Sequence, residues 1–198
     1  MSRGLSILLV LAFLAVGCSR DGGSDGASVP VSKGESLVLA QSDVGDEYAQ
    51  FDRGSQVRAD LGPPRDDANR FDREGGWKAR FSRPGTRTTD GPLVISSLAD
   101  LFGSADGARK DFDLYEQQLA DFEANGGEKV AIDEPPFGDE VSAVSYRQGL
   151  PPNAVRYYVI AWRTGNVTAS LNVSGYRLTW EEAAALGAKQ DRRIRAAG

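Results

Sequence analysis

The stretch Val-Thr-Ala-Ser-Leu-Asn-Val-Ser at residues 167–174 decides the fold, because apolar and polar side chains alternate along it without a break. Successive side chains of a β-strand point to opposite faces of its sheet, so this stretch predicts a strand with one buried face and one solvated face. A short turn at 163–165 joins it to an apolar and aromatic run at 154–162. The two runs together predict an antiparallel hairpin.

More strands and two helices are expected on either side of this hairpin. Shorter runs predict strands at 77–82, 92–98, 130–132 and 140–147. Between Ala108 and Phe122, apolar residues recur at the spacing of a helix face, and Ser104 is a suitable N-cap for that helix.

The final helix is predicted by a capping box, in which Thr179 and Glu182 stand three residues apart. Strands with one polar face, followed by helices, favour an α+β fold over a parallel doubly wound sheet. We therefore expect a single antiparallel sheet of about five or six strands, with two main helices packed on one of its faces.

The chain before the first of these strands divides into three parts. Residues 19–35 are rich in Gly, Ser and Asp, which predicts that 18–35 form a flexible tether and 36–198 a single α+β domain. Residues 36–51 predict a short helix or cap that ends near Gly45. The charged stretch 52–76 is broken by Gly and Pro and predicts a long loop, which is a contact surface, a disordered stretch or a plain connection.

The first 18 residues resemble a bacterial lipoprotein signal. Arg3 precedes an apolar run, and small residues at 15 and 17 lead directly to Cys18. The resemblance implies a signal peptide over 1–17 and a diacylglycerol thioether on Cys18, with fatty chains such as palmitate. The apolar run is shorter than the roughly 20 residues that span a bilayer. A plain secretory signal and a retained anchor are the alternatives.

This signal predicts an extracytoplasmic protein held at the cell membrane or cell envelope by its lipid. The membrane, through Cys18, is then one partner, and an envelope protein or a small ligand is the other. The chain carries 28 acidic and 23 basic residues, a formal net charge of −5, which does not favour nucleic acid as a partner.

Two absences restrict the possible chemistry. The sequence contains no histidine, which excludes a Ser-His-Asp triad, a Cys-His pair and a histidine zinc site. Its one cysteine is assigned to the lipid, so disulfides and thiolate chemistry are not expected either. We expect no cofactor, no metal and no catalytic residue.

The body of the chain resembles uncharacterised exported lipoproteins with a PsbP-like α+β sandwich. The similarity lies in residues 101–108 before the first helix, 138–140 at the start of a strand and 163–166 at the hairpin turn. It implies the same kind of fold and an extracytoplasmic accessory or binding role, and it supplies no catalytic residue.

Two residue groups are candidate sites. Four carboxylates at 133, 134, 139 and 140 are a candidate acid and base pair for a glycoside hydrolase, or simply solvated loop charge. The second group is a tentative partner surface, formed by Tyr158, Trp162, Arg163 and Asn166. Core packing is the alternative for whichever of these side chains face the helices.

The function that these observations favour is a lipid-anchored, non-catalytic binding or accessory domain of unknown ligand. One alternative is a carrier for a lipid or apolar ligand, which predicts strands that are apolar on both faces. The other is a carboxylate-dependent hydrolase.

Overall fold

The hairpin expected from residues 154–174 forms the middle of the sheet. In the computed structural model, which describes residues 28–132 and 136–198, β6 (Val155–Thr164) pairs antiparallel with β7 (Val167–Gly175). Ile160 lies opposite Leu171 in this register, so these two buried side chains point to the same face of the sheet.

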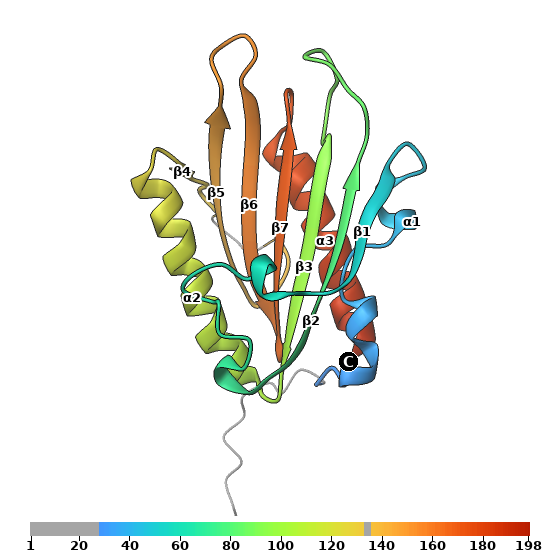
Figure 1. The fold of residues 1–198 in the computed structure, drawn as a ribbon, viewed down its shortest axis with the longest axis vertical. Helices are drawn as coiled ribbons and strands as arrows, with labels where there is room; N and C mark the ends of the chain where they lie inside the picture. The colour runs from blue at the N-terminus through green and yellow to red at the C-terminus, as the bar shows by residue number, and fades with distance from the viewer. Residues whose placement is uncertain (1–27, 133–135) are drawn as a thin grey trace, which may run out of the picture.

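The sheet has seven strands in the order β1-β2-β3-β7-β6-β5-β4, and each neighbouring pair is antiparallel (Figure 1). The remaining strands are β1 (Ala49–Ser55), β2 (Arg73–Ser82), β3 (Val94–Phe102), β4 (Glu128–Lys129) and β5 (Glu140–Gln148). This confirms the α+β class and the single antiparallel sheet, with more strands than the five or six expected. β1 was not expected because it is an edge strand with no buried residue.

The two long helices expected from the sequence are both present, and each follows a pair of strands. α2 (Ala105–Ala124) begins where the Ser104 side chain accepts a hydrogen bond from the Gly107 amide. α3 (Trp180–Ala197) begins at the predicted capping box, in which Thr179 and Glu182 each cap the other's backbone amide. Shorter elements complete the chain: η1 (Val31–Ser36), α1 (Gln41–Val44), η2 (Arg58–Asp60) and η3 (Arg70–Asp72).

The two long helices lie on opposite faces of the sheet, which corrects the expectation that both pack on one face (Figure 1). α3 covers the face that carries Ile160 and Leu171. α2 covers part of the other face, where its apolar stripe meets Val144 and Ala161. The polar side of β7 is therefore largely buried, and Thr168 is fully covered.

The chain that leads into the sheet also packs on the α3 side. Leu37 and Leu39 are completely buried in the main core. Val29 is buried as well, and its backbone exchanges hydrogen bonds with the Asn166 side chain. The predicted tether therefore ends earlier than residue 35. Its residues 18–27, Cys18 and the predicted signal at 1–17 lie outside the described residues.

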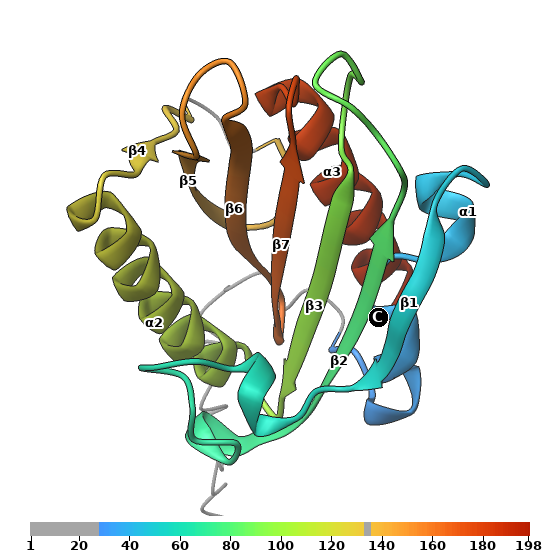
Figure 2. The ribbon, with the colours of Figure 1, turned by 45° about the horizontal axis from the view of Figure 1, so that its top comes forward.

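The expected loop over 52–76 is shorter in the structure, because 52–55 belong to β1 and 73–76 to β2. The chain between them, which we call the 56–72 segment, crosses the α2 side of the sheet from β1 toward the foot of α2 (Figure 2). None of the helices in residues 28–132 and 136–198 is long and apolar enough to cross a membrane.

Candidate functional site: a groove between helix α2 and the sheet

A groove with a volume of about 560 Å³ lies between α2 and the part of the sheet that α2 leaves uncovered. One wall is α2 from Tyr115 to Asn125, and the opposite wall is the first half of the 56–72 segment. The floor consists of side chains from β2, β3, β6 and β7: Arg80, Ser96, Leu98, Val159, Ser170 and Asn172. Small-molecule sites in proteins commonly have volumes of about 300–1,000 Å³.

The lining of the groove combines apolar and polar side chains. Leu61, Leu119 and Phe122 supply apolar surface from the two walls. Ser96 and Asn172 supply hydrogen-bonding groups from the floor, and Asn172 is exposed. Such a lining suits a ligand that has an apolar body and a few polar groups.

Three stacked aromatic rings stand at one end of this wall of α2. Phe122 stacks on Tyr146 with ring centroids 5.6 Å apart, and Tyr146 stacks on Tyr157 at 4.7 Å. Tyr146 and Tyr157 are directly opposite each other on β5 and β6. The stack explains why Phe122, which belongs to the apolar face of α2, remains 41% exposed instead of entering the core.

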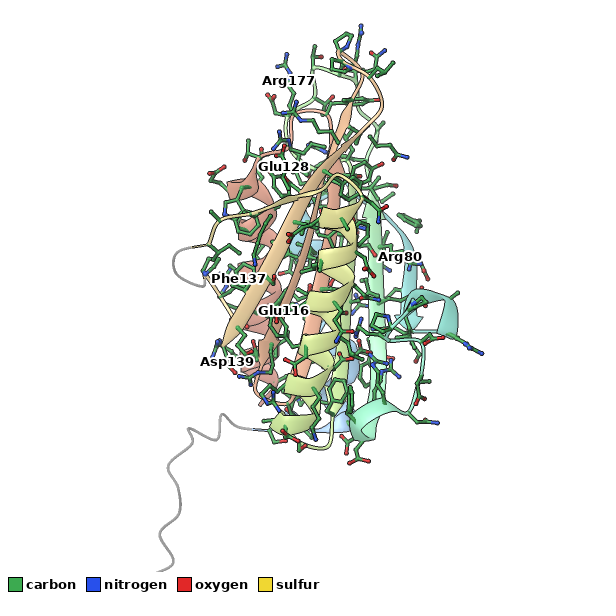
Figure 3. All side chains as sticks on the ribbon, turned by 90° about the vertical axis from the view of Figure 1, so that its left-hand side faces the viewer. Arg80, Glu116, Glu128, Phe137, Asp139 and Arg177 are labelled. Carbon is green, nitrogen blue, oxygen red and sulfur yellow. The ribbon has the colours of Figure 1, made fainter. Side chains whose placement is uncertain are left out.

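The 56–72 segment is tied to the α2 wall and to the sheet that forms the floor. Gln118 on α2 donates hydrogen bonds from its amide to the carbonyl oxygens of Gly62 and Pro63, at 3.1 and 2.7 Å. On the sheet, Arg80 and Lys78 each form ion pairs with Asp52 and Asp60. Figure 3 shows Arg80 on the sheet beside this segment and Glu116 on the outer surface of α2.

Five charged side chains, which we call the buried charge cluster, lie next to the groove at the first half of α2. They are Arg65, Arg70 and Arg73 from the 56–72 segment and the start of β2, Asp100 from β3 and Asp111 from α2. Both carboxylates are fully buried, and the side chains of Arg65 and Arg70 are 2% and 4% exposed.

Arg65 is the member that joins the cluster to the groove. Its Nε and Nη2 atoms donate to Asp111, at 3.0 and 2.9 Å, and Nη2 also donates to Asp100. Its guanidinium carbon lies 3.4 Å from the centroid of the Tyr115 ring, a cation–π contact. Both Arg65 and Tyr115 line the groove.

The electrostatics of the cluster keep the Asp111 carboxylate ionised. Burial alone would raise the pKa of Asp111, but Arg65 and Arg70 outweigh burial and hold that pKa below its ordinary value. Burial raises the pKa of Tyr115 to about 12, and its hydroxyl lies 3.0 Å from Ser170 Oγ. At neutral pH this site therefore presents charged Asp111 and neutral Tyr115.

The arginines of the cluster carry more positive charge and more hydrogen-bond donors than its two carboxylates can match. Three guanidinium groups face two carboxylates, an excess of one positive charge. Among the described residues, Arg70 Nη2 is buried without a hydrogen-bond partner, and it lies 3.6 Å from Asp100 Oδ2. A buried donor without a partner is costly, so this arrangement calls for a further acceptor.

The partner surface expected from the sequence is not a surface. Tyr158 and Trp162 are 5% and 0% exposed and belong to the core on the α3 side. Asn166 is 4% exposed and anchors the chain at Val29. Only Arg163 approaches the surface, where it pairs with Asp139 and Glu140. The strand face chosen from the sequence was the one that α3 covers.

The four carboxylates proposed for a hydrolase do not form a cleft pair in the structure. Asp139 and Glu140 both pair with Arg163 at the start of β5, on the far side of α2 from Arg80 (Figure 3). Asp133 and Glu134 lie outside the described residues. The carboxylates that do converge, Asp100 and Asp111, were not singled out from the sequence.

A sequence signal for Asp111 did exist. It lies four residues before Tyr115, on the buried stripe of a helix, and a charged residue at such a position requires a buried partner. Its arginine partners come from the stretch that was expected to be a long loop, so the sequence alone could not join them. The groove brings together residues up to 113 positions apart, from Ala59 to Asn172.

Comparison with known proteins gives one clear likeness, and it concerns the fold. No family model matches the chain, and no curated protein matches it by sequence. Among solved structures, the chain is similar to the extracellular domain of PknH from Mycobacterium tuberculosis, with a TM-score of 0.59 and 14% sequence identity. The match covers 86% of this chain and 99% of that domain. The PsbP-like sandwich stays a prediction.

Proposed function

We propose that this protein is an extracytoplasmic, non-catalytic domain that binds a small ligand in the groove between α2 and the sheet, and that lipid on Cys18 holds it at the membrane. The observation that carries the binding role is the groove itself, which is roomy, open and lined by both apolar and polar side chains. The solved domain that shares the fold is extracellular, which supports the same side of the membrane for this chain.

The two alternative functions fit the groove less well. A carrier for a wholly apolar ligand needs an apolar floor, but Ser96, Ser170 and Asn172 place polar groups there. A hydrolase needs a carboxylic acid that holds its proton near neutral pH, but Arg65 and Arg70 lower the pKa of Asp111.

A variant that fills the groove tests the binding role. Asn172→Trp places a large ring on the floor from an exposed position, where it disturbs no buried contact. The full chain is purified from envelope membranes, and small molecules that remain bound are released and identified by mass spectrometry. We expect a compound that accompanies the natural chain and is lost from Asn172→Trp.

A matched control is Thr88→Trp, which adds the same ring at an exposed loop position away from the groove. It should retain the compound. Equal recovery of every small molecule from the natural chain and both variants would refute ligand binding in the groove.

The lipid anchor has a separate test. Mass spectrometry of the natural product should find a diacylglycerol thioether on Cys18, and Cys18→Ser should release the protein from the membrane fraction. An unmodified thiol on the membrane-associated natural product would refute the anchor and leave the groove proposal intact.

A further inference from the structure

The groove and the buried charge cluster meet at one residue, and that residue indicates the chemistry of the ligand. Arg65 belongs to both. Its Nε and Nη2 atoms are used by Asp100 and Asp111, whereas Nη1 makes no hydrogen bond within residues 28–132 and 136–198. A guanidinium that lines a cavity and keeps one N–H₂ group free is a donor for an incoming acceptor.

The charge balance shows which acceptor fits. Both carboxylates beside Arg65 are engaged: Asp111 accepts four hydrogen bonds, from Arg65, Arg70 and Thr168, and each oxygen of Asp100 accepts one, from Arg65 or Arg73. One positive charge remains in excess within the cluster, and Arg65 is the member of the cluster that lines the groove. A single anionic group in the groove supplies the missing negative charge and an acceptor for Arg65 Nη1 together.

Other charges around the groove do not change this balance. Arg80 and Lys78 are matched by Asp52 and Asp60, two positive charges against two negative ones. Asp121 lies on the exposed face of α2 at the rim, where water screens its charge.

The rest of the groove is suited to an apolar body. From Tyr115, which Arg65 covers, the α2 wall extends ten residues to Asn125, a distance of about 15 Å at the helical rise. Leu119 and Phe122 line that wall, and Leu61 and Leu98 face them. The stacked rings of Phe122, Tyr146 and Tyr157 continue this apolar surface toward the end of α2.

We infer that the ligand of the groove is an amphiphile with one anionic head group, a carboxylate or a phosphate, which Arg65 binds while the apolar body lies along Leu119 and Phe122. This inference rests on the proposed function, since it names the ligand class of the same groove. The shared chemistry is an oxyanion attached to an apolar chain, whether the source is a lipid or a free acid.

A series of probes on the natural chain tests the inference without any mutation. The full chain is reconstituted in phosphatidylcholine nanodiscs, and its thermal unfolding is followed with octanoate, octyl phosphate, octanol, octylamine, acetate and inorganic phosphate. A ligand that binds the folded state raises the unfolding temperature in proportion to its affinity. Octanol and octylamine control for partition of the eight-carbon chain into the disc.

We expect octanoate or octyl phosphate to bind at least tenfold more tightly than octanol and octylamine, and also more tightly than acetate or inorganic phosphate. Equal effects of the anionic probes and octanol would overturn the head-group site. Inorganic phosphate as effective as octyl phosphate would overturn the apolar body. A neutral or cationic compound recovered from the natural chain but lost from Asn172→Trp would leave the proposed function standing and refute this ligand class.

Two variants locate the head group. Arg65→Lys keeps the charge but loses the planar fork, and it should weaken binding of octyl phosphate at least tenfold. Arg58→Gln removes an 82% exposed arginine of the same 56–72 segment and should leave the affinity unchanged. Circular dichroism and the unfolding temperature without ligand confirm that each variant is folded. Unchanged affinity in a folded Arg65→Lys would contradict the assigned role of Arg65.

Discussion

At the scale of single residues, Asp111 is important for stability because its carboxylate joins three parts of the fold: α2, the 56–72 segment and β7. It is fully buried and accepts hydrogen bonds from Arg65, Arg70 and Thr168. Asp111→Asn removes the charge with little change of shape and leaves two buried guanidinium groups undercompensated. We expect a loss of about 3–5 kcal/mol in the free energy of unfolding, measured by denaturant titration.

Asp113→Asn is the matched control for this prediction. Asp113 is two residues further along α2, 51% exposed, and pairs with Arg109 at 3.3 Å. An exposed pair of this kind contributes about 0.5 kcal/mol or less. If both variants lose the same stability, the buried cluster is not what holds the 56–72 segment against α2.

At the scale of elements, a chain of buried hydrogen bonds joins α3, β3 and the segment that precedes α1. The Leu39 amide donates to Ser97 Oγ at 3.0 Å, and the Ser97 hydroxyl donates to Gln190 Oε1 at 2.8 Å. Gln190, which is fully buried on α3, then donates to the Leu98 carbonyl at 2.9 Å. Each group satisfies the next, so removing one leaves another without a partner.

Gln190→Met, which preserves most of the side-chain volume, should therefore cost about 1–3 kcal/mol of unfolding free energy. Ser97→Ala breaks the same chain, so the double variant should lose less than the sum of the two single losses, by about 0.5 kcal/mol or more. Denaturant unfolding of the four proteins measures this coupling. Gln117→Met on the exposed face of α2 is the control, and strictly additive losses would refute the chain.

The elements differ in how far the sequence predicts them, and the reason is physical. The alternation at 167–174 and the caps Ser104 and Thr179 are local signals, and the structure confirms the strand and both caps. The solvated face predicted for that strand was wrong, because α2 and the 56–72 segment cover most of it. β1 has no local signal, since its residues are exposed and it exists only through pairing with β2. Whether a helix packs on one face of a sheet or the other is also not encoded locally.

The candidate site shows the same limit more strongly. Helical periodicity places Tyr115 and Leu119 on one face of α2, but it also predicts burial for Phe122, which the aromatic stack holds at the surface. Arg65 and Asp100 look like ordinary solvated charges until the 56–72 segment crosses the sheet and buries them together. The groove is therefore a product of tertiary structure, and sequence reasoning found its walls but not the site.

At the scale of the whole molecule, the stability should depend on pH only at the two extremes. The chain contains no histidine, the side chain that ordinarily titrates between about pH 5 and 8, so we expect a plateau from about pH 6 to 9. On the acid side, ion pairing and hydrogen bonding outweigh burial and lower the pKa values of Asp111 and Asp60. Their stabilising contribution is complete above the ordinary pKa of 3.8 and is lost as the pH falls through the folded-state values.

Denaturant unfolding measured at intervals from pH 2.5 to 9 tests this acid limb. We expect stability to be constant near neutrality and to fall steeply below about pH 4. A loss of stability that begins between pH 6 and 7 would contradict the prediction, because no group assigned here titrates in that range.

The alkaline limb depends on Tyr115, whose pKa burial raises from 10.0 to about 12. The unfolded chain begins to ionise its tyrosines near pH 10, while Tyr115 in the folded state stays neutral, so ionisation favours unfolding as the pH rises from 10 to about 12. Its contribution to this loss is on the order of 2 kcal/mol. Tyr115→Phe removes the hydrogen bond to Ser170, so this variant should be about 1 kcal/mol less stable than the natural chain at pH 7. Between pH 9 and 11, however, the variant should lose less stability than the natural chain, because it has no phenol to ionise at this position. The two curves of unfolding free energy against pH should therefore converge above pH 9. Parallel curves would show that ionisation of Tyr115 does not cause the loss of stability at alkaline pH.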